Sequence, residues 1–130
     1  MERSVSKKPT ILLIDDDKDL LELMRRKLER EGCEATISQN GEKINEIIEA
    51  KNPDCILLDI HMDGVNGADI CQRLKSQQPT SDIPVLLLSA NDNIDKIAAL
   101  CKADGYIKKP MNVALFVQKI KDVMRLKFVV

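Results

Sequence analysis

Aromatic side chains are scarce in this chain of 130 residues, which has no tryptophan, one tyrosine and two phenylalanines. A surface that stacks nucleic-acid bases on aromatic rings is therefore not expected. Cationic residues are not in excess, because the formal net charge is -1, and this balance also argues against direct nucleic-acid binding. No apolar run is long enough to span a membrane, and the first ten residues lack the apolar core of a signal peptide. We expect a cytoplasmic protein that does not bind a membrane.

Cysteine pairs with metal-ligand spacing are also missing. The four cysteines form no C-x-x-C motif, and His61 is the one histidine that could join them. A zinc site is therefore not expected, and a disulfide framework does not suit a cytoplasmic chain of this size. We predict free thiols that are buried as small apolar side chains at Cys33, Cys55, Cys71 and Cys101.

Short apolar runs alternate with amphipathic segments along the chain. The apolar runs predict strands at Thr10–Asp15, Glu34–Ser38, Cys55–Asp59, Val85–Ser89 and Gly105–Lys108. The segments with helical spacing predict helices at Lys18–Glu31, Gly41–Lys51, Ala68–Ser76, Asn93–Lys102 and Asn112–Lys127, the last capped by Asn112. Residues His61–Gly67 are expected to form a loop.

Strands that alternate with helices indicate repeated βαβ units and a parallel sheet. We therefore predict an α/β fold with a doubly wound five-stranded parallel sheet of order 2-1-3-4-5, a flavodoxin-like three-layer sandwich. The expected divisions are a flexible N-terminal tail at residues 1–9, one domain at residues 10–127 and a C-terminal end at residues 128–130.

Charged residues follow three of the predicted strands at the point where each strand ends. Asp15-Asp16-Asp17 follows the first strand, Asp59 closes the third, and Lys109-Pro110 follows the fifth. The carboxyl ends of parallel strands meet at one edge of the sheet, and open α/β sheets bind ligands at that edge. Asp15 and Asp16 should therefore lie beside Asp59, where three carboxylates repel unless a cation intervenes. Magnesium suits such a set of carboxylate oxygens.

The same edge can support phosphoryl transfer. A carboxylate at the tip of a central strand, such as Asp59, can attack phosphorus and form an acyl phosphate. Lys109 supplies a positive charge for a phosphoryl oxygen, and Ser89 at the end of the fourth strand supplies a hydroxyl. Asp17 is expected to be a solvated residue at a helix start, and the side chain of His61 is expected to face solvent.

In this order and at these strand ends, the motifs resemble those of the receiver domains of two-component response regulators. They are Asp15-Asp16, Asp59 with Met62 and Gly67 after it, Ser89-Ala90 and Lys109-Pro110, within a match from Thr10 to Leu126. The resemblance implies the chemotaxis-regulator-like fold. It also implies that the chain is a signalling module rather than an enzyme, catalysing only its own phosphorylation and dephosphorylation.

The resemblance assigns a role to each site residue. Asp59 would be the phosphoacceptor, and the donor would be a phosphohistidine on a sensor histidine kinase or a histidine phosphotransfer protein. Asp16 would bind Mg²⁺ directly, Asp15 would act through water, and the backbone carbonyl of His61 would be the remaining protein ligand.

Further roles concern the switch that the resemblance implies. Ser89 would hydrogen-bond the phosphoryl group, Lys109 would pair with it, and Tyr106 would turn inward when Ser89 moves. An unidentified downstream protein, or a second copy in a dimer, would dock on the face formed by the fourth helix, fifth strand and fifth helix.

The chain departs from the family pattern at three places. Asp63 stands where the family usually has proline, and this change adds negative charge near the site. The segment from Ser89 to Pro110 is about two residues shorter than usual, with Lys102-Ala103 in place of Gly-Ala, which puts the fourth helix in question. Positions His61 and Asn91, which flank the phosphoryl group, tune its lifetime in this family.

Other functions compete with the phosphorylation switch. A phosphorelay intermediate or phosphate sink would pass the group on without an output of its own, and a degenerate receiver would keep the fold but not react. A flavin-binding module needs a Ser/Thr/Gly-rich loop where Asp15-Asp16-Asp17 stands, and a metal-dependent phosphohydrolase needs an acid where His61 stands. We expect either a stand-alone receiver or one cut from a longer protein. The terminal residues Leu126–Val130 are apolar for a free end, which indicates truncation before a linker or packing against a neighbour.

Overall fold

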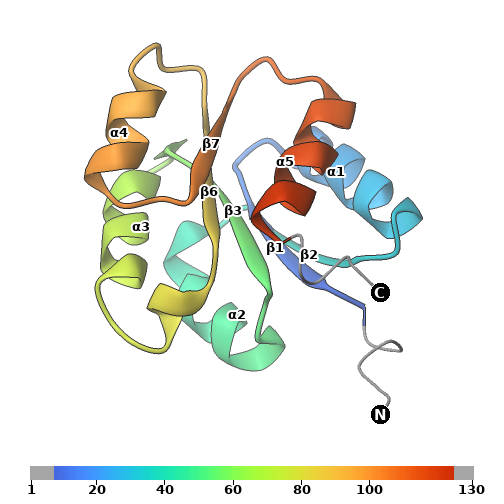
Figure 1. The fold of residues 1–130 in the computed structure, drawn as a ribbon, viewed down its shortest axis with the longest axis horizontal. Helices are drawn as coiled ribbons and strands as arrows, with labels where there is room; N and C mark the ends of the chain where they lie inside the picture. Colours follow the sequence, from blue (N-terminus) through green and yellow to red (C-terminus); the bar gives the residue numbers. More distant parts are fainter. Residues whose placement is uncertain (1–7, 125–130) are drawn as a thin grey trace.

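The computed structural model describes residues 8–124, in which a parallel sheet lies between two layers of helices (Figure 1). Neighbouring strands of this sheet are parallel throughout, in the order β2-β1-β3-β6-β7. In chain order this is the predicted 2-1-3-4-5 arrangement, which is confirmed. The strands are β1 (Thr10–Ile14), β2 (Glu34–Ser38), β3 (Cys55–Asp59), β6 (Val85–Ser89) and β7 (Gly105–Lys108).

The helices cover the two faces of the sheet unequally. Side chains of α1 and α5 belong to one apolar cluster, and side chains of α2, α3 and α4 belong to the other. Successive residues of a strand point to opposite faces, so Ile11 and Leu13 enter the first cluster while Leu12 and Ile14 enter the second. The helices are α1 (Lys18–Arg30), α2 (Ile44–Lys51), α3 (Gly67–Lys75), α4 (Ile94–Leu100) and α5 (Val113–Val123).

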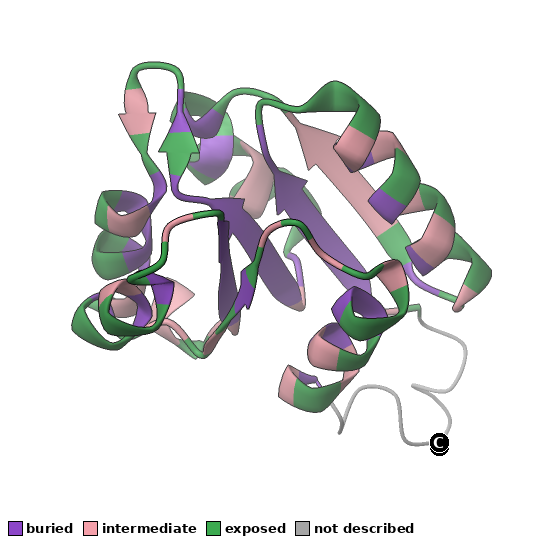
Figure 2. Cartoon of the chain, turned by 90° about the horizontal axis from the view of Figure 1, so that it is seen from above, coloured by how far each residue is buried: buried purple, intermediate pink, exposed green. Residues whose placement is uncertain are grey.

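Burial follows position in the sheet (Figure 2). Every residue of β1, β3 and β6 is buried, whereas the edge strand β2 is only partly covered. Central strands that are covered on both faces need apolar side chains throughout, which is why these three segments read as continuous apolar runs. The four cysteines are free and buried, as predicted.

The segment after β3 is a hairpin, so the prediction of a loop at His61–Gly67 was wrong. Strands β4 (His61–Met62) and β5 (Val65–Asn66) pair in antiparallel fashion, with Met62 opposite Val65. The two residues between them are Asp63 and Gly64, and Gly64 has a φ of 72°. An Asp-Gly pair suits the tight turn of a two-residue hairpin because glycine adopts positive φ without strain.

Several helix boundaries differ from the predicted ones. The first turn of the second predicted helix is a separate 3₁₀ helix, η2 (Gly41–Lys43), and another, η3 (Thr80–Asp82), precedes β6. The fourth helix forms but stops at Leu100, because Lys102 turns the backbone into the left-handed region at a φ of 63°.

The ends of the chain lie partly outside this description. The cap at Asn112 is confirmed, since its side chain accepts hydrogen bonds from the next turn, but α5 ends at Val123. Residues 125–127 of the predicted last helix, the C-terminal end and residues 1–7 of the predicted tail lie outside the described residues. Within residues 8–124, no helix combines the length and hydropathy needed to cross a lipid bilayer.

Candidate functional site

Three carboxylates meet at the carboxyl edge of the sheet, as predicted. Asp15 and Asp16 follow β1, Asp59 ends β3, and these strands are neighbours with Ile14 opposite Leu58. Each of the three acids contributes one oxygen to a group in which all oxygens lie within 4.8 Å of one another. Asp15 and Asp59 are buried, whereas Asp16 is exposed, so the group opens to solvent on the side of Asp16.

Lys109 brings a cation to two of these acids. Its Nζ lies 3.0 Å from Oδ2 of Asp15 and 3.7 Å from Oδ1 of Asp59. The backbone N–H of Lys109 donates to the carbonyl of Ser89 at 2.9 Å, and this bond fixes the start of the loop beyond β7. The sequence predicted Lys109 at this edge but did not predict its ion pair with Asp15.

Ser89 also lies at this edge, since it ends β6, the strand next to β3. Its side chain is buried, and its Oγ accepts a hydrogen bond of 3.0 Å from the backbone N–H of Asn91. The hydroxyl keeps its own hydrogen, which can be donated to an incoming oxygen. The structure therefore brings together the carboxylates, the lysine and the hydroxyl that the sequence analysis selected.

The charges in this site shift the pKa values of two residues. Burial, followed by the charge of Asp15, raises the pKa of Asp59 from 3.8 to about 6, although Lys109 opposes the change. Burial pulls the pKa of Lys109 down, but the neighbouring carboxylates of Asp15, Asp59 and Asp16 outweigh it and raise the value. Lys109 therefore stays charged at neutral pH, and Asp59 is ionised in most molecules above pH 7.

The donor set fits a small divalent cation. Oδ2 of Asp15 is buried and makes no hydrogen bond within the described residues, and its contact with Lys109 is an ion pair. With Asp16 and Asp59 it offers hard oxygen ligands that lie close together, which is the ligand type that Mg²⁺ prefers. Burial is the main cause of the raised pKa of Asp59, and a cation here would offset the further contribution from the charges of Asp15 and Asp16.

Two backbone features hold the acids in position. A Cβ atom built on Gly67 would lie 2.0 Å from the backbone oxygen of Asp59, so only glycine fits beside the end of β3. The N–H of Gly67 donates to the carbonyl of Ile60 at 2.7 Å, which ties α3 to that strand end. Gln39 donates from Nε2 to the carbonyl of Asp16 at 3.1 Å, a contact that the sequence analysis missed.

Residues at the rim of the site face solvent. His61 is exposed, as predicted, but it lies on β4 rather than in a loop. Asp63 is exposed in the turn of the hairpin. Asp17 caps α1, with its carboxylate accepting a hydrogen bond of 3.1 Å from the N–H of Leu20, which agrees with a role at the helix start.

Residues of β7 alternate between the core and the surface. Lys108 is half exposed and pairs at the surface with Asp92 at 2.5 Å. The side chain of Tyr106 lies on the outer surface, 38% exposed, and the ammonium of Lys119 is 5.9 Å from its ring centroid. Tyr106 is therefore in an outward position in this structure.

Comparisons with known proteins agree with this geometry. The family model of the response regulator receiver domain matches residues 11–121. The chain is 36% identical over 118 residues to the phosphate regulon transcriptional regulatory protein PhoB of Pseudomonas aeruginosa, covering 89% of this chain and 52% of the relative. It is 39% identical over 116 residues to the heme response regulator HssR of Staphylococcus epidermidis, covering 88% of this chain and 50% of the relative.

Solved structures show the same fold. The signal receiver domain of a DNA-binding response regulator from Colwellia psychrerythraea superposes with a TM-score of 0.82 at 27% identity, covering 91% of this chain and 99% of the other. The chemotaxis protein CheY4 of Vibrio cholerae gives a TM-score of 0.82 at 18% identity, covering 90% of this chain and 99% of the other. At this identity the similarity concerns the fold alone. The chain belongs to the response regulator receiver domain family, and it spans about half the length of the curated relatives it matches.

Proposed function

We propose that Asp59 is the phosphoacceptor of a two-component signalling switch. The observation that carries the proposal is the meeting of Asp15, Asp16 and Asp59 with Lys109 at the carboxyl edge of the sheet. Competent groups fill each position of the site, which favours an active receiver over a degenerate one. The catalysis in this proposal is limited to phosphorylation and dephosphorylation of the chain itself.

The transfer begins with the ionised carboxylate of Asp59, which is available above pH 7 although its pKa is raised to about 6. One carboxylate oxygen attacks the phosphorus of a phosphohistidine, so that an oxygen–phosphorus bond forms and the phosphorus–nitrogen bond breaks. The imidazole leaves with the electron pair of that bond and takes a proton from solvent. Hydrolysis of the resulting acyl phosphate returns Asp59 to its starting state.

The other residues stabilise the charge of the transferred group. Lys109 is close enough to Asp59 to pair with a phosphoryl oxygen, and Ser89 can donate its hydroxyl hydrogen to another. Mg²⁺, held by Asp16, Asp59 and the carbonyl of His61 and through water by Asp15, would neutralise charge on the acids and the phosphoryl group.

In this proposal Tyr106, which lies at the surface in this structure, takes part in the output. A donor kinase or phosphotransfer protein would deliver the phosphoryl group, and Ser89 and Tyr106 would then rearrange the face formed by α4, β7 and α5. A downstream protein or a second copy would bind this face. Added phosphoryl charge acts on such surfaces by biasing an equilibrium between two conformations.

The experiment is labelling by acetyl phosphate with Mg²⁺, followed by intact mass spectrometry. Wild-type protein should gain the mass of one phosphoryl group, and EDTA should suppress the gain. Asp59→Asn should not be labelled, whereas Asp63→Asn, which alters an exposed acid of the adjoining turn, should still be labelled. Undiminished labelling of Asp59→Asn would overturn the proposal.

A further inference from the structure

A groove of about 730 Å³ lies at the opposite edge of the sheet from the acidic site. One wall is α2 with the turn that follows it, and the other wall is the segment from Pro79 to Pro84 that leads into β6. Its apolar surface comes from Ile48 and Ile83 together with three prolines. The prolines are Pro53, Pro79 and Pro84.

The charged side chains described in the lining of the groove are all acidic. Among residues 8–124, Glu46, Glu49, Asp54 and Asp82 line the groove, and no lysine, arginine or histidine does. The whole chain carries 20 lysines and arginines against 21 acids, so this local imbalance is not a property of the composition. A negative potential over a concave apolar surface attracts cationic ligands and repels nucleic acid and anionic membranes.

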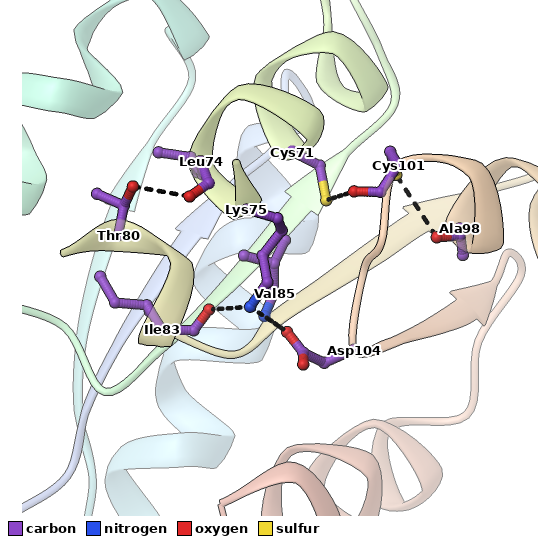
Figure 3. A network of polar contacts seen from close by, with 9 residues as sticks. All are labelled: Cys71, Leu74, Lys75, Thr80, Ile83, Val85, Ala98, Cys101 and Asp104. Atoms are coloured by element: carbon purple, nitrogen blue, oxygen red, sulfur yellow. Dashed lines mark hydrogen bonds and ion pairs between the residues drawn. The ribbon is translucent and has the colours of Figure 1, made fainter. Parts of the chain in front are cut away.

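The second wall is fixed to the body of the domain by a polar network (Figure 3). Thr80 donates from Oγ1 to the carbonyl of Leu74 at 2.8 Å. Lys75 donates from Nζ to the carbonyl of Ile83 at 2.9 Å and to Asp104 at 2.8 Å. Asp104 also accepts from the N–H of Val85 at 2.8 Å. Because this network fixes the second wall and three prolines line the groove, the groove is preformed. Binding a ligand therefore costs less free energy for ordering the groove.

We infer that this groove binds a short basic segment of a partner protein, with lysine or arginine side chains at the acidic rim and an apolar side chain between Ile48 and Ile83. The charge of the lining selects the cationic residues, and the isoleucines and prolines select the apolar one. A polyamine would meet the first requirement but not the second.

The groove and the acidic site can act independently. The groove lies where β3 and β6 begin, and the acidic site lies where β3 and β6 end. A strand of five residues is about 15 Å long, so a segment bound in the groove leaves Asp59 open to a phosphodonor. The groove would therefore anchor a partner through a complete cycle of phosphorylation.

The test uses a synthetic peptide, acetyl-Lys-Leu-Lys-Lys-Leu-Lys-amide, titrated into ¹⁵N-labelled protein in low salt with millimolar Mg²⁺ present. Amide shifts should concentrate in the non-proline residues of Ile44–Asp54 and in Thr80–Ile83. Glu46→Gln/Glu49→Gln should weaken binding about fivefold, as expected for two exposed charges. Glu29→Gln/Asp122→Asn, which removes the same charge from exposed positions outside the groove, should leave affinity unchanged.

Two further ligands test the apolar part of the inference. A peptide with serine in place of both leucines, and spermidine, should each bind at least about fivefold more weakly than the leucine peptide. Equal binding of spermidine would show attraction of any cation and would overturn the inference. The inference would also be overturned if the groove variant Glu46→Gln/Glu49→Gln and its control bound the leucine peptide with equal affinity. Amide shifts centred on residues 15–17 and 59–61, at the acidic site, would overturn it as well.

Discussion

Lys109 pairs more closely with Asp15 than with Asp59, at 3.0 Å against 3.7 Å. The carboxylate of Asp15 is almost completely buried, with 1% of its side chain exposed. A buried carboxylate is costly unless a cation compensates for its lost hydration. Lys109 therefore supplies the compensating charge for Asp15 as well as a contact for the phosphoryl group.

Removing that cation should destabilise the metal-free protein. We expect Lys109→Ala to lower the free energy of unfolding by about 2 kcal/mol at pH 7.5 in EDTA, because two buried acids lose their partner. Mg²⁺ should restore most of the loss, since it binds only the folded state. Urea unfolding with and without Mg²⁺ measures both effects.

Lys108→Ala is the matched control for this prediction. Lys108 is 50% exposed and pairs with Asp92 at the surface, so its removal should cost less than about 0.5 kcal/mol. If Lys108→Ala and Lys109→Ala lose the same free energy of unfolding, the contact between Lys109 and Asp15 contributes no more to stability than a surface ion pair.

The raised pKa of Asp59 predicts a pH-dependent stability. The folded state holds a proton on Asp59 up to about pH 6, whereas the ordinary pKa of this carboxyl is 3.8. The folded state therefore binds more protons between these values, and the metal-free wild type loses stability as the pH rises from about 4 to about 6. We expect Asp59→Asn to be more stable than the wild type by about 3 kcal/mol at pH 7.5 in EDTA.

This difference should fall close to zero near pH 4, where Asp59 is protonated in the folded wild type. Urea unfolding of both proteins at the two pH values measures it. Mg²⁺ should narrow the difference at pH 7.5 because it stabilises the wild type more. The interpretation fails if Asp59→Asn is no more stable than the wild type at pH 7.5 in EDTA.

Gly67 should not tolerate a side chain. Because a Cβ there would lie 2.0 Å from the backbone oxygen of Asp59, Gly67→Ala must displace the end of β3 or the start of α3. We expect a loss of more than about 2 kcal/mol in the free energy of unfolding. In the fraction that still folds, labelling by acetyl phosphate should be slower, because the acceptor carboxylate is displaced.

Gly64→Ala separates steric from conformational effects. Gly64 has a φ of 72° but nothing within 4 Å of the added Cβ, so alanine there costs about 1 kcal/mol through backbone strain alone. Its labelling rate should match that of the wild type. Similar labelling rates for the two alanine variants would contradict a positioning role for Gly67.

Much of the fold could be predicted because its central strands are buried on both faces. Continuous apolar runs such as Val85–Ser89 marked these strands, and the charged residues at their ends then located Asp15, Asp59 and Lys109 at one edge. Side-chain chemistry and topology were enough to place these groups together. The order of the strands followed from the alternation of strands and helices.

Other features depend on geometry that a linear pattern does not carry. The strands of the hairpin around Asp63-Gly64 have two residues each, too few to show the alternation of apolar and polar residues that marks a strand. The Asp-Gly pair was the one sequence signal for its turn. The ion pair between Lys109 and Asp15 depends on how a long side chain crosses the edge of the sheet. The bond from Gln39 to Asp16 joins a polar residue beyond an edge strand to a neighbouring loop, and no periodicity marks such a residue.

The buried thiols should be inert until the domain unfolds. The thiolate is the reactive form of cysteine, and burial raises the pKa of Cys33 to about 11 and raises those of Cys55 and Cys71 further. Cys101, at the end of α4, is buried as well.

We expect Ellman's reagent to label no thiol of the native protein within minutes at pH 7.5 and to label all four in denaturing urea. The midpoint of labelling against urea concentration should coincide with the loss of helical circular dichroism. Labelling of one thiol at a lower urea concentration would reveal local opening, and Cys71→Ser and Cys101→Ser variants would show whether that opening lies between α3 and α4.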